Sequence, residues 1–269
     1  SMVNILLNGA NGNMGKALCE YIKDSVNFSL LYGIDKDNSD LYNKLTKKPD
    51  VIIDFSTPSA TFLALDYAIK NLVPIVIATT GFSSDEENKI KEFSEAIPIF
   101  KSSNMAYGIN IFSNIVSELA RKLNNVDIEI IEKHHRNKVD APSGTALMIA
   151  DNINKVCNNK YSYVFTRRAS GNKLKNSCNS NNSNNFKKSN NNFKSYNEIG
   201  FSSIRGGTLV GEHTVLFIGE NESFELTHTA HSRNIYVEGA LKAAEFIVNK
   251  KNGLFGMKDL CLLDSKRCN

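Results

Sequence analysis

The stretch VNILLNGANGNMGKAL, residues 3–18, is the clearest indication of the fold of the first half of this chain. Its apolar start predicts a buried strand, and the spacing of apolar residues at 16–23 predicts a helix soon after it. Three glycines separate the two predicted elements: Gly9, Gly12 and Gly15. At such a turn the first glycine permits the bend, the second lets the backbone approach a pyrophosphate, and the third permits close helix–strand packing. The stretch therefore predicts the opening βα unit of a dinucleotide-binding domain.

The acidic residue that such a unit requires is also present. The glycine spacing is G-x-x-G-x-x-G rather than the more specific G-x-G-x-x-G, so a glycine-rich turn in another kind of α/β protein is the alternative. Asp35 ends a second predicted strand over 28–35 and stands 20 residues after Gly15. There its carboxylate would accept the hydroxyls of the adenosine ribose, and the adjacent Lys36 could pair with a 2′-phosphate. We expect NADH to bind and NADPH to be tolerated.

Strand and helix signals continue to alternate up to about residue 104. Apolar runs predict strands at 50–56, 74–80 and 97–101, and helical spacing appears at 60–70 and from Ser83 or Ser84 to about 95. Alternation of this kind indicates βαβ units and a parallel sheet, as in Rossmann-like folds. The loops 78–81 and 102–105 follow strands, and ligands of open α/β sheets bind at such strand ends.

Beyond residue 105 the pattern becomes that of an α+β domain with an open mixed sheet. The predicted elements are a helix at 110–123, an alternating strand at 127–132, a helix at 145–156, a strand at 199–204, a hairpin of 211–218 with 223–230, and a last helix at 235–250. We predict a dinucleotide-binding domain over 1–104, to which 233–269 returns. A substrate-binding and oligomerisation domain would occupy 105–232.

Composition narrows the class of protein. The hydrophobic fraction is 41% and the charged fraction 22%, which is ordinary for a soluble globular chain. No apolar run approaches the ~20 residues of a membrane helix. The five cysteines are scattered, which disfavours a disulfide framework and a structural zinc site. With no export signal, the expected location is the cytoplasm, and no membrane partner is expected.

The positive net charge belongs to one segment. Residues 171–195 hold five lysines and no acid, so the total of +4 leaves 4 − 5 = −1 for the rest. This distribution does not favour a folded nucleic-acid-binding surface, and we expect no nucleic acid partner. The same segment is rich in asparagine and poor in apolar residues, so we predict a poorly ordered surface loop. An RNA- or anion-binding arm is the functional alternative.

The stretch EKHHRNKVDAPSGTA, residues 132–146, is the most informative for chemistry. It brings up to four cationic side chains together: His134, His135, Arg136 and Lys138. Ser143, Gly144 and Thr145 then offer donors at a predicted helix start, so the stretch predicts an anion-binding cradle that suits a carboxylate. A histidine near its ordinary pKa, or a lysine whose pKa is lowered by cations, can donate a proton at neutral pH.

These histidines have two other interpretations. Paired histidines at a strand end are often solvated surface residues. His213, His228 and His231 invite a metal site, but no acid or cysteine stands at ligand spacing, so we expect no metal.

The stretch 132–146 resembles the signature of the 4-hydroxy-tetrahydrodipicolinate (dihydrodipicolinate) reductase family. The resemblance covers nearly the whole chain, through GANGNMG at 9–15, ATTGF at 78–82, NMAYGIN at 104–110, EIGFSSIRGG at 198–207, VGEHTVLF at 210–217 and LTHTAHSR at 226–233. It implies that His134 is a proton donor or acceptor and that Lys138 is a proton donor. His135 and the backbone of Gly144 and Thr145 would bind substrate carboxylates.

The resemblance also implies a cofactor site and a reaction. The dinucleotide would lie on Gly9, Ala10, Asn11, Gly12, Asn13, Met14, Asp35, Lys36, Ala78, Thr79, Thr80, Ser102, Ser103, Asn104 and Met105. Ala78 and the Ser102–Ser103 pair depart from the family's more usual glycine and alanines. The implied activity is NAD(P)H-dependent reduction of a cyclic imine that carries two carboxylates, with loss of water, in lysine and diaminopimelate biosynthesis. A homotetramer is implied, and the domains would close about hinges near residues 105 and 233.

Two alternatives of other kinds remain at this point. One is a different dehydrogenase with a small substrate that shares only the dinucleotide-binding half. The other is a non-catalytic dinucleotide sensor, which would keep the glycine loop and Asp35 but would not need the histidine–lysine cluster.

Overall fold

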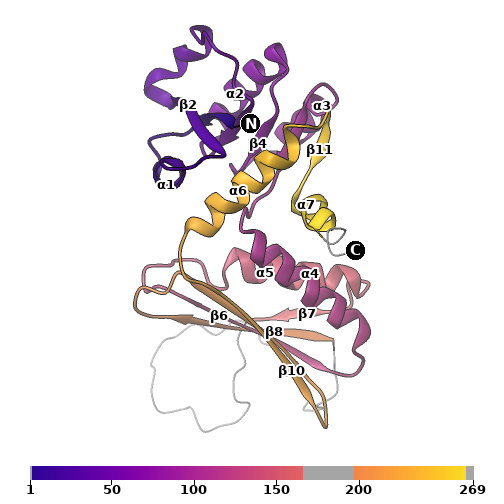
Figure 1. Cartoon of the computed structure of the whole chain (residues 1–269). Coiled ribbons are helices and arrows are strands. Elements are labelled where there is room, and N and C mark those ends of the chain that lie inside the picture. The colour runs from indigo at the N-terminus through magenta and orange to yellow at the C-terminus, as the bar shows by residue number, and fades with distance from the viewer. Residues whose placement is uncertain (1, 166–196, 265–269) are drawn as a thin grey trace, which may run out of the picture. The chain divides into compact units, whose positions relative to one another are not determined.

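A computed structural model of the chain describes residues 2–165 and 197–264 (Figure 1). It contains two compact units, one formed by residues 1–112 with 232–269 and the other by residues 113–231. The asparagine-rich segment 171–195 lies outside the described residues, so the predictions for it are untested. Each unit is described by itself below.

The first unit is built on a six-stranded parallel sheet, as the sequence predicts. Its strands are β1 (Val3–Asn8), β2 (Phe28–Ile34), β3 (Val51–Asp54), β4 (Ile75–Ile77), β5 (Pro98–Lys101) and β11 (Gly253–Phe255), in the order β11-β5-β4-β3-β1-β2. Their pairings are parallel throughout the sheet. The chain leaves β1 toward β2 on one side and continues with β3 on the other, so the carboxyl ends of β1 and β3 form the switch point where ligands of such sheets bind.

Helices cover both faces of this sheet. They are α1 (Asn13–Ile22), the 3₁₀ helix η1 (Lys36–Asn43), α2 (Pro58–Asn71), α3 (Ser84–Phe93), α6 (Asn234–Ile247) and α7 (Met257–Asp264). One buried cluster joins the sheet to α1, α6 and α7, and a second joins it to α2 and α3. The sequence signals at the helix starts are explained locally: Ser83 caps α3 with Glu86 in a capping box, and Pro58 occupies the first turn of α2.

The last long helix, α6, packs against the first-unit sheet although β5 ends at residue 101 and α6 begins only at residue 234. A Cβ atom placed on Gly239 of α6 would lie 1.6 Å from the carbonyl oxygen of Met105. Only a glycine lets the helix backbone approach the chain after β5 this closely.

The second unit holds a five-stranded mixed sheet. Its strands are β6 (Asp127–His134), β7 (Ser162–Val164), β8 (Glu198–Arg205), β9 (Gly211–Ile218) and β10 (Ser223–Ala230), in the order β10-β9-β6-β8-β7. Strands β6, β7 and β8 are parallel, whereas β9 and β10 form the predicted antiparallel hairpin. Two helices accompany it, α4 (Tyr107–Lys122), which crosses the boundary between the units, and α5 (Gly144–Val156).

Strand β6 positions the chemistry of this unit. It alternates strictly, with Ile128, Ile130, Glu132 and His134 buried on one face. The sequence predicts this alternation only to residue 132, and the structure extends the strand to His134, whose carbonyl accepts the amide of Gly206 at 3.0 Å. Glu132 and His134 therefore point toward the same covered face.

Several short elements differ from the sequence-based prediction. β7 and β11 have three residues each, too few for a periodic pattern, and η1 and α7 are short as well. In the described parts of the chain, no helix has the length and apolar character needed to cross a membrane.

Candidate active site

The glycine loop after β1 is closed by contacts that only glycine permits. Gly9 has a positive φ of 86°, and a Cβ there would lie 2.4 Å from the carbonyl oxygen of Phe55. A Cβ on Gly15 would lie 2.2 Å from the carbonyl oxygen of Gly9. Gly12 is the N-cap of α1 and has no side chain to cap the first turn. The loop thus brings bare backbone to a helix N-terminus, an arrangement that suits a phosphate.

Asp35 follows β2 and lies beside the glycine loop. Its carboxylate accepts the backbone amide of Asn11 at 2.9 Å and that of Lys36 at 2.8 Å. These hydrogen bonds, that from Asn11 foremost, hold the pKa of Asp35 below its ordinary value. The residue therefore stays ionised at neutral pH, and the same carboxylate ties the glycine loop to the end of β2.

A buried carboxylate fixes the ends of β1, β3 and β4. Asp54, fully buried at the end of β3, accepts hydrogen bonds from Asn8 at 2.8 Å, Thr61 at 2.6 Å and Thr79 at 2.8 Å, and also from the hydroxyl of Ser56. The Thr79 hydroxyl in turn accepts the amide of Ser56 at 2.9 Å. Asp54 thereby holds together the strand ends beside the predicted cofactor site. No pattern in the sequence pointed to this role.

The candidate residues after β4 and β5 occupy two loops at the same edge of the sheet. Thr80 is exposed and Ala78 is half-buried, whereas Thr79 is engaged with Asp54. The Ser102 hydroxyl donates to the carbonyl of Asn104 at 2.8 Å, which holds the second loop in a tight turn. Met105 is buried in the core, and its carbonyl oxygen faces Gly239 of α6.

In the second unit, His134 is buried and paired with a carboxylate. Its Nδ1 lies 2.5 Å from Oε2 of Glu132. Burial lowers the pKa of His134, as do the cations Lys138 and Arg205, against the opposite effect of Glu132. The sequence predicts a histidine near its ordinary pKa; the pKa is lower in the structure because His134 is buried at the end of β6.

Glu132 is the centre of this arrangement. Arg205 on β8 donates to both of its oxygens, from Nη1 to Oε2 at 2.8 Å and from Nη2 to Oε1 at 2.7 Å. The amide of Ser143 donates to Oε1 at 3.3 Å. Burial raises the pKa of Glu132, but the hydrogen bonds from Arg205, Ser203 and His134 outweigh it, so the pKa is lowered overall and the carboxylate is ionised.

The other predicted residues of the cluster lie around this core. Lys138 pairs with Asp140 at 2.8 Å, and Gly144 donates its amide to the same carboxylate at 3.3 Å. Lys138 therefore stands beside the start of α5, where Gly144 is exposed and Thr145 half-buried. His135 is half-buried at the turn after β6. The structure places all these residues in one unit, around one end of the mixed sheet.

A second histidine completes the buried network. The Ser143 hydroxyl accepts the amide of Ala146 as the N-cap of α5 and lies 3.0 Å from Nε2 of His213. The rings of His134 and His213 meet edge to face at 5.2 Å. Burial, then the neighbouring His134, lowers the pKa of His213 to about 4, so this ring is neutral at pH 7.

Sequence reasoning missed four members of this network, and for different reasons. Glu132 stands two residues before His134 on an alternating strand, so its place on the same face was available as a signal. Ser143 was recognised as a helix cap but not as a partner of a histidine. Arg205 and His213 reach the site through strand pairing with β6, which no local pattern reveals.

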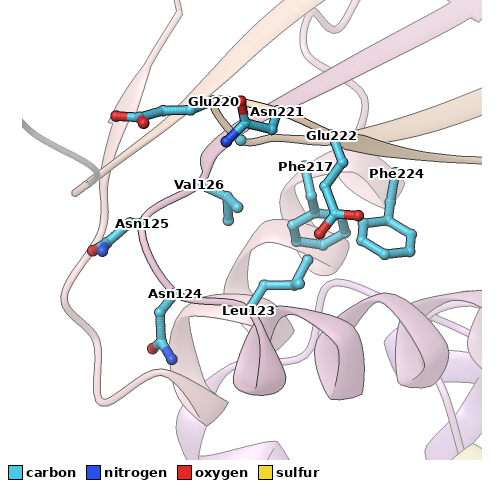
Figure 2. Close-up of a pocket in the computed structure, with 10 residues that line it drawn as sticks. Leu123, Asn124, Asn125, Val126, Phe217, Glu220, Asn221, Glu222 and Phe224 are labelled. Atoms are coloured by element: carbon cyan, nitrogen blue, oxygen red, sulfur yellow. The ribbon is translucent and has the colours of Figure 1, made fainter.

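A separate cavity lies at the other end of this sheet. A hollow of about 430 Å³ lies where Leu123–Val126 meet the β9–β10 hairpin, with Phe217, Glu222 and Phe224 around it (Figure 2). This is the end of the sheet at which β6 begins, whereas His134 ends that strand. The hollow holds none of the predicted catalytic or carboxylate-binding residues, so we do not take it as the active site.

The comparisons with known proteins decide the family. Residues 3–105 match the model of the N-terminal domain of dihydrodipicolinate reductase, and residues 108–261 match the model of its C-terminal domain. The chain belongs to the dihydrodipicolinate reductase family. It is therefore a pyridine-nucleotide-dependent oxidoreductase, as the sequence resemblance implied.

Individual relatives agree with this assignment. The chain is 42% identical to the 4-hydroxy-tetrahydrodipicolinate reductase of Caldanaerobacter subterraneus, over 96% of this chain and 98% of the relative. It is 40% identical to that of Clostridium novyi over the same shares. Among solved structures, the fold is similar to that of a dihydrodipicolinate reductase of Paenisporosarcina sp. TG-14 with dipicolinate bound, with a TM-score of 0.73. The alignment covers 95% of the present chain and 98% of that chain, at 24% sequence identity. The last comparison supports the fold.

Proposed function

We propose that this member of the family reduces 4-hydroxy-tetrahydrodipicolinate to tetrahydrodipicolinate with loss of water, as a step of lysine and diaminopimelate biosynthesis. The observation that carries the proposal is the cluster at the end of β6, where a carboxylate-bound imidazole and a lysine stand beside the start of α5. A ligand that bears two carboxylates matches such a cluster by charge and by hydrogen bonding. The relatives from Caldanaerobacter subterraneus and Clostridium novyi carry the name of this activity.

The roles of the residues follow from their surroundings. When bound, the reduced nicotinamide supplies the hydride. The glycine loop and Asp35 would hold the dinucleotide, with the loops 78–80 and 102–105 beside it. His135 and the backbone of Gly144 and Thr145 would bind the substrate carboxylates. Because burial lowers the pKa of His134, its imidazolium is a stronger acid than an exposed one, and it can donate a proton to the reduced ring.

Lys138 is proposed as a further proton donor. Its ammonium is held by Asp140, which also accepts the amide of Gly144. The lysine is therefore kept near the proposed carboxylate site rather than free in solvent. Positive charge there also stabilises the negative charge that develops on the ring during reduction.

The finer assignments complete the proposal. We infer that residues 1–104 with 233–269 bind the nucleotide and that 105–232 bind the substrate and form a homotetramer in the cytoplasm. The ionised Asp35 favours a free 2′-hydroxyl over a phosphate, so NADH should be preferred, with NADPH tolerated through Lys36.

Steady-state reduction of the aspartate-semialdehyde/pyruvate condensation product with each nucleotide tests the activity. His134→Ala and Lys138→Ala should each lower kcat by about 10²- to 10⁴-fold, the usual contribution of a positioned proton donor. The Kd for NADH should stay unchanged in both variants. Lys133→Ala is the matched control, because Lys133 is adjacent on β6 but pairs with Glu212 on the opposite face. Loss of NADH binding in the His134 and Lys138 variants would show that the site is misplaced.

A further inference from the structure

We propose that Glu132 is a positioning residue that fixes the tautomer and orientation of His134, and that Arg205 keeps Glu132 in the form that does so. The inference rests on the proposed function only in giving His134 the proton-transfer role. It concerns residues to which that function assigns no part.

The hydrogen bond to Glu132 determines which ring nitrogen of His134 carries the proton. An ionised carboxylate can only accept, and Oε2 of Glu132 lies 2.5 Å from Nδ1 of His134. Nδ1 must therefore be the protonated nitrogen of the neutral ring. The proton that is exchanged with a substrate is then carried by Nε2.

The surroundings of Nε2 agree with that assignment. A Cβ atom on Gly211, at the start of β9, would lie 3.0 Å from Nε2 of His134. Because the residue is a glycine, the space beside Nε2 is not filled by a side chain from β9. Glu132 and Gly211 thus act on opposite sides of the ring, one holding Nδ1 and the other leaving room at Nε2.

Arg205 preserves the acceptor character of Glu132. Glu132 is 1% exposed, and an uncompensated buried carboxyl takes up a proton. A protonated Glu132 could donate to Nδ1 and would move the ring proton to Nε2. The two hydrogen bonds from the guanidinium, at 2.7 and 2.8 Å, oppose this change. Lysine at position 205 would keep the charge but lose the two-pronged geometry.

The same carboxylate also connects His134 to the proposed carboxylate site. Ser143 donates its amide to Oε1 of Glu132 at 3.3 Å and begins α5, and Arg205 donates to the carbonyl of Asp140 at 2.6 Å. Glu132 and Arg205 therefore set the imidazole and the first turn of α5 relative to each other. Such precise placement is needed when one group binds a ligand and the other transfers a proton to it.

The experiment compares Glu132→Gln with Glu212→Gln, each in the full-length chain. The amide of glutamine can donate to Nδ1 and so should reverse the tautomer of His134. We expect kcat to fall about 10²-fold or more, with an unchanged KM for NADH. The alkaline limb of the pH profile of kcat, where activity is lost as His134 deprotonates, should move to lower pH, because the carboxylate that raises the pKa of His134 is gone. Glu212 pairs with Lys133 on the opposite face of the same sheet, so its variant should behave like the wild type.

Nitrogen-15 NMR of labelled histidines gives a readout that does not depend on activity. With the His134 signals assigned by loss in His134→Asn, the wild type should show a protonated Nδ1 and Glu132→Gln a protonated Nε2. Arg205→Lys should lower kcat in the same direction by a smaller factor. A protonated Nε2 in the wild type, or wild-type kcat and pH profile in Glu132→Gln, would overturn the inference. Lack of turnover by the wild type with the condensation product would instead refute the proposed function and leave the tautomer result standing.

Discussion

At the scale of single residues, Ser143 has two structural tasks at once. Its hydroxyl caps α5 by accepting a hydrogen bond from the amide of Ala146. The same hydroxyl lies 3.0 Å from Nε2 of the buried His213. Ser143→Ala should therefore lower the free energy of unfolding by about 2–4 kcal/mol, a lost cap plus an unsatisfied buried group. Ser83→Ala, which removes a cap in an exposed capping box, should cost only about 1 kcal/mol. Urea denaturation followed by circular dichroism measures both, and equal losses would contradict the second task.

His213 also predicts how stability depends on pH. Its folded-state pKa of about 4 lies below the ordinary 6.5, so the unfolded chain binds the extra proton between these values. The contribution of neutral His213 to the free energy of unfolding is therefore fully present above pH 6.5. It is lost as the pH falls toward 4, by up to about 1.4 kcal/mol per pH unit. The lowered pKa values of His134 and His228 act in the same direction.

The urea midpoint should therefore decrease from pH 7 to pH 5. His213→Gln should flatten this dependence whatever it does to the absolute stability, because one depressed histidine is removed. A slope in His213→Gln as steep as in the wild type would show that other groups determine it.

At the scale of elements, Asp54 joins the carboxyl ends of three strands with α2. Asp54→Asn replaces one acceptor oxygen by an amide that faces hydroxyl donors. We expect the Kd for NADH to rise by at least about tenfold, equivalent to about 1.4 kcal/mol, because the loops after β1 and β4 lose their common anchor. Isothermal titration with NADH measures this change.

Asp50→Asn provides the matched control for that element. Asp50 accepts the amide and side-chain nitrogen of Asn4 near the amino ends of β1 and β3, at 2.7 and 2.8 Å. Like Asp54, Asp50 is a carboxyl side chain that accepts hydrogen bonds from a residue of β1, but it lies at the amino ends of the strands. An equal rise in Kd for both variants would mean that general loosening of the sheet, rather than the position of Asp54, affects NADH.

The docking of α6 is the second prediction at this scale. Gly239→Ala places a methyl group against the Met105 carbonyl at 1.6 Å, so α6 must shift. We expect a loss of about 1–3 kcal/mol, typical of overpacking, despite the better helix propensity of alanine. Gly144→Ala, where a Cβ meets nothing within 4 Å, should leave thermal stability close to that of the wild type. The melting temperatures of the two variants, measured by thermal unfolding, test this prediction.

At the scale of the whole molecule, the sequence implies assembly. The family resemblance predicts a homotetramer formed through the second domain, and the mixed sheet of that unit presents Phe224 on β10 at 40% exposure. Sedimentation velocity should give about four times the chain mass of 29.9 kDa. Phe224→Glu should shift the distribution toward smaller species if this strand contributes to the interface. A monomer for the wild type at micromolar concentration would contradict the prediction.

The local architecture and the principal chemistry could be predicted from the amino-acid sequence. The glycine loop, the buried strands of the parallel sheet and the hairpin of β9 with β10 follow from patterns a few residues long, since turn geometry and side-chain alternation are local properties. The histidine–lysine stretch is likewise continuous in the chain, so its residues were named from sequence.

The surroundings of those residues could not be predicted in this way, because they depend on how distant parts of the chain pack together. Arg205 reaches Glu132 because β8 pairs with β6, and His213 reaches Ser143 because β9 pairs with β6. The pKa of His134 is lowered by burial, which depends on which face of the sheet is covered. Asp54 accepts hydrogen bonds from the hydroxyls of Ser56, Thr61 and Thr79, which burial and strand pairing bring together. Burial and strand pairing join residues distant in sequence, and no local periodicity records them.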